Sequence, residues 1–433
     1  MKIINTKDAN FKDEFNSILA RAKSDIKGVS SIVMNIIDEI VEEGNEALKR
    51  HISKFDKWEI KSDDDLMINP EDMKKAYENI NDDLRKALHT AYDRIKAYHE
   101  KQLPKSWLDF EANGTILGQK VTPVDRAGLY IPGGKAAYPS SLLMNAIPAI
   151  VAGVKEIVVC TPTPENEVNE LLLAACHLCG VSKAYKVGGA SAIAAMAYGT
   201  QTIPKVDVIT GPGNIFVATA KKLVFGEVNI DMIAGPSEIG ILADATAKPH
   251  YLAIDLLSQA EHDEMASSIM ITTCDEVAEL TSREVEAYLK TLSRETIARK
   301  SIEERGAIIV ASSMEEAIEL MNEIAPEHLE VMTKNPFELL PFIKHAGAIF
   351  LGENTPEPIG DYIAGPNHTL PTGGTAKFYS PLNVENFLKK SSIISFSKKA
   401  INDLGESCAL LADTEGLTAH AKSVRVRLEE KGE

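Results

Sequence analysis

Gly128-Leu-Tyr-Ile131 is the first of a series of short, mostly β-branched runs that alternate with helix-compatible stretches in this chain of 433 residues. The later runs are Ile157-Val-Val-Cys160, Val206-Asp-Val-Ile209, Ile239-Gly-Ile-Leu242, Ile269-Met-Ile-Thr272, Ile308-Ile-Val310 and Ala348-Ile-Phe350. Such alternation is typical of parallel sheets, because a helix is the usual crossover between two parallel strands. We therefore predict an α/β fold with mostly parallel sheets and helices on both faces. The length exceeds what one hydrophobic core usually serves, which predicts two large domains.

The first hundred residues have the pattern of helices. Apolar side chains recur at three- and four-residue spacing from Val29 onward, which predicts one helix with a buried stripe. The stripe consists of Ile32, Val33, Ile36, Ile37, Ile40 and Val41. A second helix is expected to begin with Asn69 as its cap and Pro70 in its first turn, and to continue until Pro104 stops it.

Residues 352–381 break the alternation, because they are rich in Gly, Pro and Thr and follow neither period. A long stretch of this kind inside a compact domain is either functional or disordered. Its Tyr, Phe and Ile residues and its low charge argue against disorder, so we predict an ordered functional loop. Residues 384–428 are expected to resume regular structure.

The composition excludes several classes of protein. The net charge of −17 argues against nucleic-acid or anionic-membrane partners, which need clustered Lys and Arg. The amino terminus lacks an apolar signal core, and no stretch has the apolar length needed to cross a bilayer. The five cysteines are odd in number and scattered, as in a reducing compartment, and Cys176 and Cys179 are expected to be buried helix residues. We therefore predict a cytoplasmic protein.

Three Gly-rich turns that follow predicted strands are candidate nucleotide sites. The first, Gly128 to Lys135, resembles a phosphate-binding P-loop, but an extra residue intrudes before the Lys and Ala136 replaces the required Ser or Thr. The others are Gly188-Gly-Ala-Ser-Ala192 and Gly211-Pro-Gly-Asn214. Glycines there let a pyrophosphate approach N–H groups at a helix amino end. None is a dinucleotide fingerprint, and alone each is more often a tight turn, but three in succession favour a nucleotide.

A candidate metal site begins at the end of an apolar helix, where Gln259 and His262 are three residues apart and so share one face. A solvated polar face is the usual meaning of a His in such a place. Asp361 and His420 would complete a mixed nitrogen and oxygen set that suits Zn²⁺, and also Mn²⁺ or Co²⁺. Spacing alone does not select these residues, because His368 is an equal candidate.

Glu327 and His328 are the acid–base candidate. They adjoin in Pro326-Glu-His328, between a helix-compatible run and an apolar stretch. A His can take and return protons near neutral pH, and a neighbouring carboxylate can activate water or hold the imidazolium. An exposed polar pair at a turn is the commoner meaning of a Glu-His dipeptide.

Several stretches of the chain are specific enough to identify a family. They are Gly211-Pro-Gly-Asn214, Ile230-Asp-Met-Ile-Ala-Gly-Pro-Ser-Glu238, Ser258-Gln-Ala-Glu-His-Asp263, Ala325-Pro-Glu-His-Leu-Glu330, Gly360-Asp-Tyr-Ile-Ala-Gly-Pro-Asn-His368 with Leu370-Pro-Thr-Gly-Gly374, and Gly416-Leu-Thr-Ala-His-Ala421. In this order they resemble the histidinol dehydrogenase family, and the resemblance runs through nearly the whole chain.

The resemblance implies a role for each site residue. The implied zinc ligands are Gln259, His262, Asp361 and His420, and the implied catalytic pair is Glu327 and His328. The implied substrate contacts are Ser237, Gln259, His262, His328, Asp361, Glu415 and His420. The implied NAD contacts are Tyr130, Ser191 and Asn214. At Ser191 the chain departs from the family, which commonly has a longer Gln there.

The resemblance also implies an architecture of two Rossmann-like domains. It predicts an amino-terminal arm over residues 1–26 and a first domain over 27–127 and 239–381, the latter part carrying the metal and catalytic residues. An NAD-binding domain is inserted over 128–238. The carboxy-terminal tail, 382–433, is expected to cross to the partner in a homodimer, where it would complete the neighbour's site.

The activity that the resemblance implies is oxidation of L-histidinol to L-histidine through bound L-histidinal, the last step of histidine biosynthesis, with two NAD⁺ and one Zn²⁺ per subunit. Relatives of the family oxidise other polyols, such as dihydroxypropanesulfonate, and need a cation for the anionic head group. Glu415 favours a cationic amino substrate instead. From the metal ligands alone a metallohydrolase stays open, and from the Gly-rich turns alone a nucleotide-binding protein without catalysis.

Overall fold

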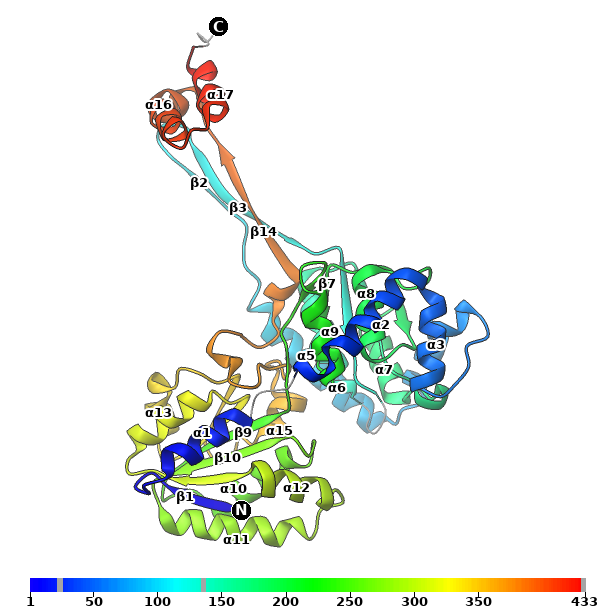
Figure 1. The fold of residues 1–433 in the computed structure, drawn as a ribbon, viewed down its shortest axis with the longest axis vertical. Helices are drawn as coiled ribbons and strands as arrows, with labels where there is room; N and C mark the ends of the chain where they lie inside the picture. The colour runs from blue at the N-terminus through cyan, green and yellow to red at the C-terminus, as the bar shows by residue number, and fades with distance from the viewer. Residues whose placement is uncertain (22–25, 134–137, 430–433) are drawn as a thin grey trace. The chain divides into compact units, whose positions relative to one another are not determined.

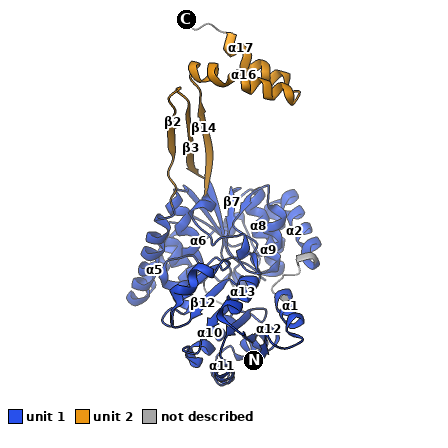
Figure 2. Ribbon diagram, turned by 90° about the vertical axis from the view of Figure 1, so that its left-hand side faces the viewer, with its two compact units in different colours: residues 1–102, 124–387 blue, residues 103–123, 388–433 orange. Residues whose placement is uncertain are grey.

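A computed structural model describes residues 1–21, 26–133 and 138–429 of the chain. The chain forms two compact units, one of residues 1–102 and 124–387 and one of residues 103–123 and 388–433 (Figure 2). The first unit contains two parallel sheets covered by helices, and the second contains an antiparallel sheet (Figure 1). The predicted α/β class with mostly parallel sheets is confirmed. Lys135 and Ala136 of the first Gly-rich turn lie outside the described residues.

The six-stranded sheet of the first unit is parallel throughout. Its order is β1 (Lys2–Asn5), β11 (Ala307–Val310), β10 (Ser267–Thr272), β9 (Glu238–Ala243), β12 (His328–Met332) and β13 (Ala348–Leu351). Successive side chains of a strand point to opposite faces of the sheet, so in β9 Ile241 belongs to one hydrophobic core and Leu242 to the other. The first core includes α10 (Pro249–Ala260), α11 (Asp275–Leu289) and α12 (Glu295–Arg305), and the second includes α1 (Phe11–Arg21) and α13 (Met314–Ile324). The short helix α14 (Pro336–Leu339) follows β12.

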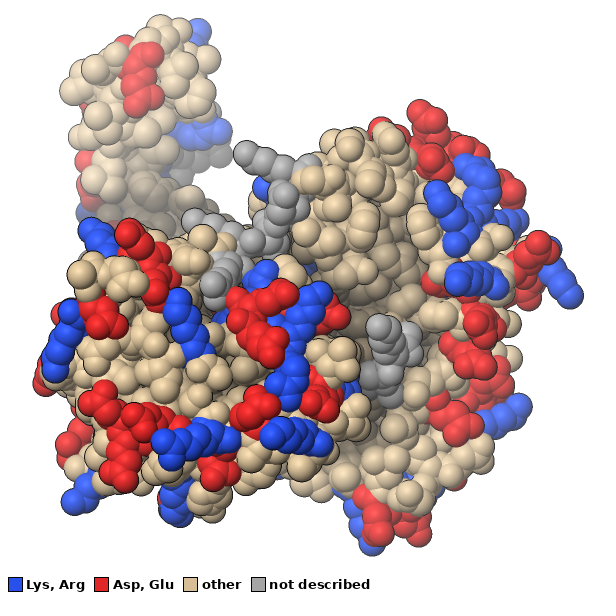
Figure 3. Space-filling model, turned by 60° about the horizontal axis from the view of Figure 1, so that its bottom comes forward, with Lys and Arg blue, Asp and Glu red and all other residues tan. Residues whose placement is uncertain are grey.

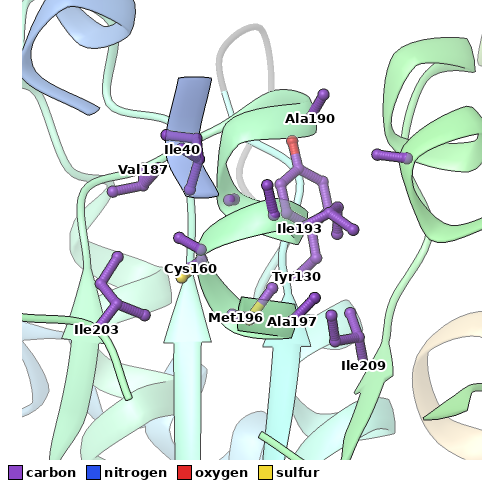
Figure 4. Close-up of a cluster of buried hydrophobic side chains, with 14 of the residues drawn as sticks. Ile40, Tyr130, Cys160, Val187, Ala190, Ile193, Met196, Ala197, Ile203 and Ile209 are labelled. Carbon is purple, nitrogen blue, oxygen red and sulfur yellow. The ribbon is translucent and has the colours of Figure 1, made fainter. Parts of the chain in front are cut away.

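The five-stranded sheet is also parallel. Its order is β6 (Lys183–Tyr185), β5 (Glu156–Cys160), β4 (Arg126–Tyr130), β7 (Val208–Thr210) and β8 (Asn229–Ile230). One core contains α2 (Ser30–Glu43), α3 (Asn45–Phe55), α8 (Gly189–Tyr198) and α9 (Ile215–Val224). In it, Ile40, Cys160, Met196 and Tyr130 belong to one cluster of buried side chains (Figure 4). Helix α6 (Pro139–Ala152) contacts β4, α5 (Asp82–Glu100) and α7 (Glu170–Leu178), and α7 in turn contacts α4 (Pro70–Asn79).

Two placements bear on the predicted domain boundaries. Strand β1, which falls within the predicted arm of residues 1–26, pairs with β11 of the six-stranded sheet. Helices α2 and α3, which fall within the predicted segment 27–127, bury their apolar side chains against the five-stranded sheet. By their contacts, residues 30–55 therefore belong with the sheet that carries the Gly-rich turns.

The predicted helix starting at Asn69 begins as expected, because the Asn69 side chain accepts a hydrogen bond from the N–H of Glu71. Its predicted length is wrong. Helix α4 ends at Asn79, and Asn81 caps α5 by accepting the N–H of Leu84 at 2.8 Å. An Asn side chain competes with the backbone for such bonds, so it restarts the helix rather than continuing it. In α2 the predicted stripe is buried only along its centre, and Ile32 and Val41 are half exposed.

Residues 352–381 are folded, as the predicted ordered loop requires. They contain α15 (Glu357–Ile359), a π-helical turn over Gly360–Ala364 and a 3₁₀ turn over Thr375–Lys377. Cys176 and Cys179 are buried thiols on α7 and at its end, and all five cysteines, which lie within the described ranges, are free thiols.

The second unit is built from the antiparallel strands β2 (Trp107–Phe110), β3 (Ile116–Pro123) and β14 (Leu388–Ser395), followed by the paired helices α16 (Lys398–Thr414) and α17 (Thr418–Glu429). It leaves large apolar side chains in solvent, among them Phe110, Ile394, Leu410 and Leu411, each more than 60% exposed. Within the described parts of the chain, none of the helices has both the length and the apolarity to cross a bilayer. On the face shown in Figure 3, acidic and basic side chains are interspersed.

Candidate active site

Glu327 and His328, the predicted catalytic pair, lie where α13 passes into β12. Ala325 ends α13 in the left-handed region with φ of 52°, a conformation that costs a non-glycine residue roughly 1–3 kcal/mol. This strained residue and Pro326 turn the chain directly from the helix into the strand. The side chains of both predicted residues are buried, with Glu327 7% exposed and His328 3% exposed.

The backbone of Glu238, the first residue of β9, holds both groups. Its N–H donates to Glu327 Oε2 at 2.9 Å, and its carbonyl oxygen lies 3.1 Å from His328 Nδ1. A carbonyl oxygen can only accept, so Nδ1 carries the proton in this bond. The other ring nitrogen, Nε2, is buried without a hydrogen-bond partner among the described residues. His328 Nε2 is therefore the atom that can take or give a proton.

Two carboxylates face this nitrogen. Asp361 Oδ1 lies 3.6 Å and Glu357 Oε1 lies 3.9 Å from His328 Nε2. Burial lowers the pKa of His328, but Glu327, Asp361 and Glu357 together raise it to about 10. Burial raises the pKa of Glu327 to about 7. Burial also acts to raise the pKa of Asp361, but contact with His328 outweighs it and holds that pKa below its usual range.

The same carboxylates belong to a group of metal-type ligands. One ligand atom from each of His262, Glu357 and Asp361 lies within 4.8 Å of the others. Gln259, whose carbonyl accepts the N–H of His262, is fully buried, and neither polar atom of its amide has a hydrogen-bond partner in the described structure. An unsatisfied buried polar atom costs about 1–3 kcal/mol. A divalent cation would give the Gln259 oxygen a partner, so these residues fit a metal ion.

Asp361 is positioned by the π-helical turn, a form that is frequent at functional sites. Arg94 of α5 donates to the carbonyls of Ile363 at 2.6 Å and Ala364 at 3.2 Å. His368 Nδ1 lies 3.0 Å from the carbonyl oxygen of Asp361 itself. Arg94 lies on α5, which contacts α6, and α6 contacts β4 of the five-stranded sheet. The π-helical turn is therefore connected to that sheet through α5 and α6.

A cavity of about 670 Å³ opens onto these groups. Its walls include His328, Asp361 and His368, with Asn367 and Asn383 among the other polar residues. Neither Lys nor Arg is among the described residues that line it. The cavity therefore has the size for a small molecule, and its charged walls favour a cationic one.

The predicted NAD contacts lie at the other sheet. Strand order reverses between β4 and β7, because the chain runs from β4 to β5 on one side and from β7 to β8 on the other. Ligands of doubly wound sheets bind at the carboxyl ends of strands at such a point. Tyr130 ends β4 there, and Asn214 follows β7 and caps α9 by accepting the N–H groups of Phe216 and Val217.

Ser191 is placed differently. It lies in the first turn of α8, is 4% exposed, and its hydroxyl lies 2.9 Å from Nδ1 of His51. The other nitrogen of that ring lies 2.9 Å from Oε2 of Glu39. The Ser191 hydroxyl thus forms a hydrogen bond within the protein, with the ring of His51.

The remaining predicted residues are distributed over both units. Ser237 immediately precedes Glu238 in the first unit and is partly exposed. Glu415 ends α16 and His420 lies in α17, both exposed on the second unit.

Sequence reasoning missed the buried acids around the site. Glu357 accepts a hydrogen bond from Ser258 at 3.0 Å, and its N–H donates to Glu330 Oε1 at 2.7 Å. Burial raises the pKa of Glu357 to about 8, and burial beside Asp255 raises that of Glu330. Glu330 could have been found from the sequence, because a carboxylate inside an otherwise apolar strand must have polar partners. Glu357 lies in an irregular Pro-rich segment, where no sequence pattern distinguishes a buried carboxylate from an exposed one.

Fold and site together define an enzyme built on two doubly wound sheets, with a buried acid–base pair beside a group of metal-type ligands. The histidinol dehydrogenase family model matches residues 19–428. The chain therefore belongs to the histidinol dehydrogenase family, a family of oxidoreductases.

Individual relatives match this chain over nearly its full length. Histidinol dehydrogenase of Sulfurimonas denitrificans is 73% identical over 423 residues, which is 98% of each chain. That of Wolinella succinogenes is 68% identical over 428 residues, or 99% of each chain. The crystal structure of histidinol dehydrogenase from Elizabethkingia anophelis matches with a TM-score of 0.93 at 35% identity, covering 99% of this chain and 98% of that one.

Proposed function

We propose that this protein oxidises L-histidinol to L-histidine in two NAD-dependent steps through bound L-histidinal, as the last step of histidine biosynthesis. The observation that carries the proposal is the joint anchoring of Glu327 and His328 by Glu238, beside His262 and Asp361. An alcohol oxidation needs a base within reach of the hydroxyl, and an aldehyde oxidation needs a second base for water.

We propose one Zn²⁺ per subunit, held by Gln259, His262, Asp361 and His420. The unpartnered amide of Gln259 and the close ligand atoms of His262 and Asp361 support this assignment. When bound, the ion would orient the substrate and its charge would offset that of Asp361, which would lower the pKa of His328 toward the range in which imidazole accepts a proton.

The protein's own groups then divide the proton transfers. His328 Nε2 takes the hydroxyl proton of histidinol, while the carbinol hydrogen leaves as hydride. Glu327 next takes a proton from water, whose oxygen adds to the aldehyde carbon, and His328 gives the proton it holds to the former carbonyl oxygen, which completes the hydrate. His328 takes a hydroxyl proton of the resulting hydrate as the second hydride leaves and the carboxylic acid forms. NAD⁺ accepts the hydride in each step.

Substrate recognition is assigned to Ser237, Gln259, His262, His328, Asp361, Glu415 and His420. A cationic amino substrate agrees with the Asp and Glu side chains at the cavity and with the absence of Lys and Arg from its described lining. Dihydroxypropanesulfonate, the alternative substrate, would bring its anionic head group to the same carboxylates.

Tyr130, Ser191 and Asn214 are the proposed NAD contacts. Tyr130 and Asn214 are supported by their place beside the reversal of strand order between β4 and β7. For Ser191 the support is its place at the amino end of α8, where N–H groups favour a phosphate.

We further propose a cytoplasmic homodimer in which Glu415 and His420 of the partner subunit complete each site. The exposed apolar side chains of the second unit support a partner surface there. Mixed dimers of His328→Ala and His420→Ala subunits test the exchange. Exchange would leave one intact site in each mixed dimer, so a 1:1 mixture of subunits, in which about half of the dimers are mixed, would regain up to about a quarter of the parental activity. Sites completed within one subunit would stay inactive.

The activity is tested by counting NADH. Two NADH formed per L-histidinol consumed, and loss of turnover with a chelator followed by recovery with Zn²⁺, are the expected results. One NADH per substrate would reject the second oxidation. Turnover of dihydroxypropanesulfonate with none of L-histidinol would reject the substrate, and bound metal without NAD reduction would indicate a hydrolase.

A further inference from the structure

We infer that Lys221 and Asp231 form a buried ion pair whose role is to position the turn Gly211–Asn214 for the dinucleotide, an inference that rests on the proposed use of NAD. Lys221 lies on α9, and Asp231 directly follows β8. Their side chains are 3% and 0% exposed and are in direct contact with each other.

Both charges are bound to the same residue of the turn. Asp231 Oδ2 accepts the N–H of Gly211 at 2.9 Å, and Lys221 Nζ donates to the carbonyl of Gly211 at 2.9 Å. Asp231 Oδ1 also accepts the N–H of Met232 at 2.6 Å. The pair therefore fixes both polar groups of one peptide residue, and through them the direction in which the turn leaves β7.

Gly211 cannot hold this direction by itself if the ion pair is lost, because a glycine backbone is conformationally permissive. Its φ is +116°, and an added Cβ would lie 2.0 Å from the carbonyl oxygen of Tyr130. The turn is thus pressed against the last residue of β4. The hydroxyl of the same Tyr130 accepts the N–H of Gly189 at 3.2 Å, at the start of α8 (Figure 4). Two of the three Gly-rich turns consequently contact one residue, Tyr130: the Gly211 turn lies against its backbone and the Gly189 turn against its hydroxyl.

A role in stability alone does not account for the pair. Two desolvated charges often stabilise a fold no better than apolar side chains of the same volume. Lys221 is also not placed to bind a phosphate, because it is buried and its ammonium is occupied by Asp231 and the Gly211 carbonyl. What apolar side chains could not supply is a donor and an acceptor for Gly211.

The test compares two double variants. Lys221→Met with Asp231→Leu removes both hydrogen bonds to Gly211 but leaves no unpaired charge. Lys221→Gln with Asp231→Asn removes the charges but keeps a donor and an acceptor. Lys205→Met, which breaks an exposed ion pair with Glu227 between the segments that precede β7 and β8, is the control. The dissociation constant of NAD⁺ is measured by calorimetry, alongside thermal unfolding, zinc content and steady-state kinetics.

We expect the Met/Leu variant to bind NAD⁺ at least tenfold more weakly and to raise KM for NAD⁺ in proportion. Its kcat at saturating NAD⁺ and its KM for L-histidinol should stay within about threefold of the parent, and its zinc content should be unchanged. The Gln/Asn variant and the control should bind NAD⁺ like the parent. A folded Met/Leu variant with parental NAD⁺ affinity would overturn the inference.

If the Met/Leu variant does not fold, Lys221→Met alone is measured in its place. Asp231 keeps its two backbone N–H donors in that variant, so its carboxylate stays partly satisfied. Parental affinity in folded Lys221→Met likewise overturns the inference. Failure of the parent protein to bind or reduce NAD⁺ would instead reject the proposed function, and the inference with it.

Discussion

Replacing Glu327 by Gln should separate the two oxidations. Glu327 Oε2 accepts one hydrogen bond, from the N–H of Glu238. A Gln amide oxygen can accept the same bond from nearly the same position, so the fold should be preserved. What is lost is the negative charge that would let this group take a proton from water.

The magnitude follows from two effects. Loss of a general base slows a step by about 10²- to 10⁴-fold, or roughly 2.7–5.4 kcal/mol of barrier. Only the aldehyde step needs water, so only that step should lose this factor. The second effect is on His328, whose Nδ1 lies 3.7 Å from Glu327 Oε2 and whose pKa that carboxylate raises. Without it the pKa of His328 falls, and the acid limb of histidinol oxidation should move by about one pH unit or more to lower pH.

The assay supplies L-histidinol and L-histidinal separately and follows NADH. With Glu327→Gln we expect histidinal oxidation to fall at least a hundredfold. Histidinol should still be oxidised to the aldehyde, so the yield should approach one NADH per histidinol. Asp263→Asn, which changes an exposed carboxylate next to the proposed metal ligand His262, is the matched control. Aldehyde oxidation at the parental rate in Glu327→Gln would refute the assignment of Glu327 as the base for water.

Further predictions concern single groups. His328→Ala should lower turnover of both substrates by about 10²-fold or more while zinc content stays parental, and loss of zinc by metal analysis would contradict its placement outside the ligand set. His262→Ala should lose zinc and raise KM for L-histidinol together, and a variant that kept zinc and full activity would contradict the metal site. Gly211→Ala should lower the melting temperature and abolish NAD⁺ binding, because its Cβ would overlap Tyr130. Burial raises the pKa of Glu238 to about 8 and that of Glu327 to about 7, both from 4.5. Their neutral forms therefore stabilise the fold fully below pH 4.5, and in metal-free protein the melting temperature should fall as the pH rises from about 4.5 to about 8. A flat profile there would contradict these buried carboxyls.

The strands could be predicted from the sequence because the residues of each buried strand form a short apolar, mostly β-branched run. β-branched runs such as Ile157–Cys160 and Ile308–Val310 form strands at or near their predicted positions. The predicted helix after Asn69 failed at Asn81 because its apolar spacing continues across the break, while the cap that restarts the helix depends on one side chain. The spacing of apolar residues indicates which face of a helix is buried, but it does not indicate where the backbone hydrogen bonds of one helix end and those of the next begin.

The site was harder to predict because it is assembled from distant segments. Glu327 and His328 adjoin in sequence and could be noticed as a pair, but the residue that holds both of them, Glu238, is about ninety positions away. Glu357 reaches the site from an irregular segment whose backbone hydrogen-bonds to Glu330. Residue spacing contains no information about such contacts, and only resemblance to a family could select Asp361 over His368.

The connection from Asp231 to Ser237 explains how two sheets can serve one reaction. Dinucleotides bind at the carboxyl edge of a doubly wound sheet, whereas His328 and Glu238 lie at the amino ends of β12 and β9. The chain leaves β8 at its carboxyl end and enters β9 at its amino end through this one connection, which can span at most about 25 Å. Its first residue clamps the Gly211 turn, and the residue that follows it, Glu238, holds the acid–base pair. Hydride transfer requires the two reacting carbons to approach within about 3–3.5 Å. A single short segment with an anchor at each end is therefore suited to hold the nicotinamide and the base at a fixed distance from each other. A change in the length of this segment should impair turnover even where every ligand and contact residue is retained.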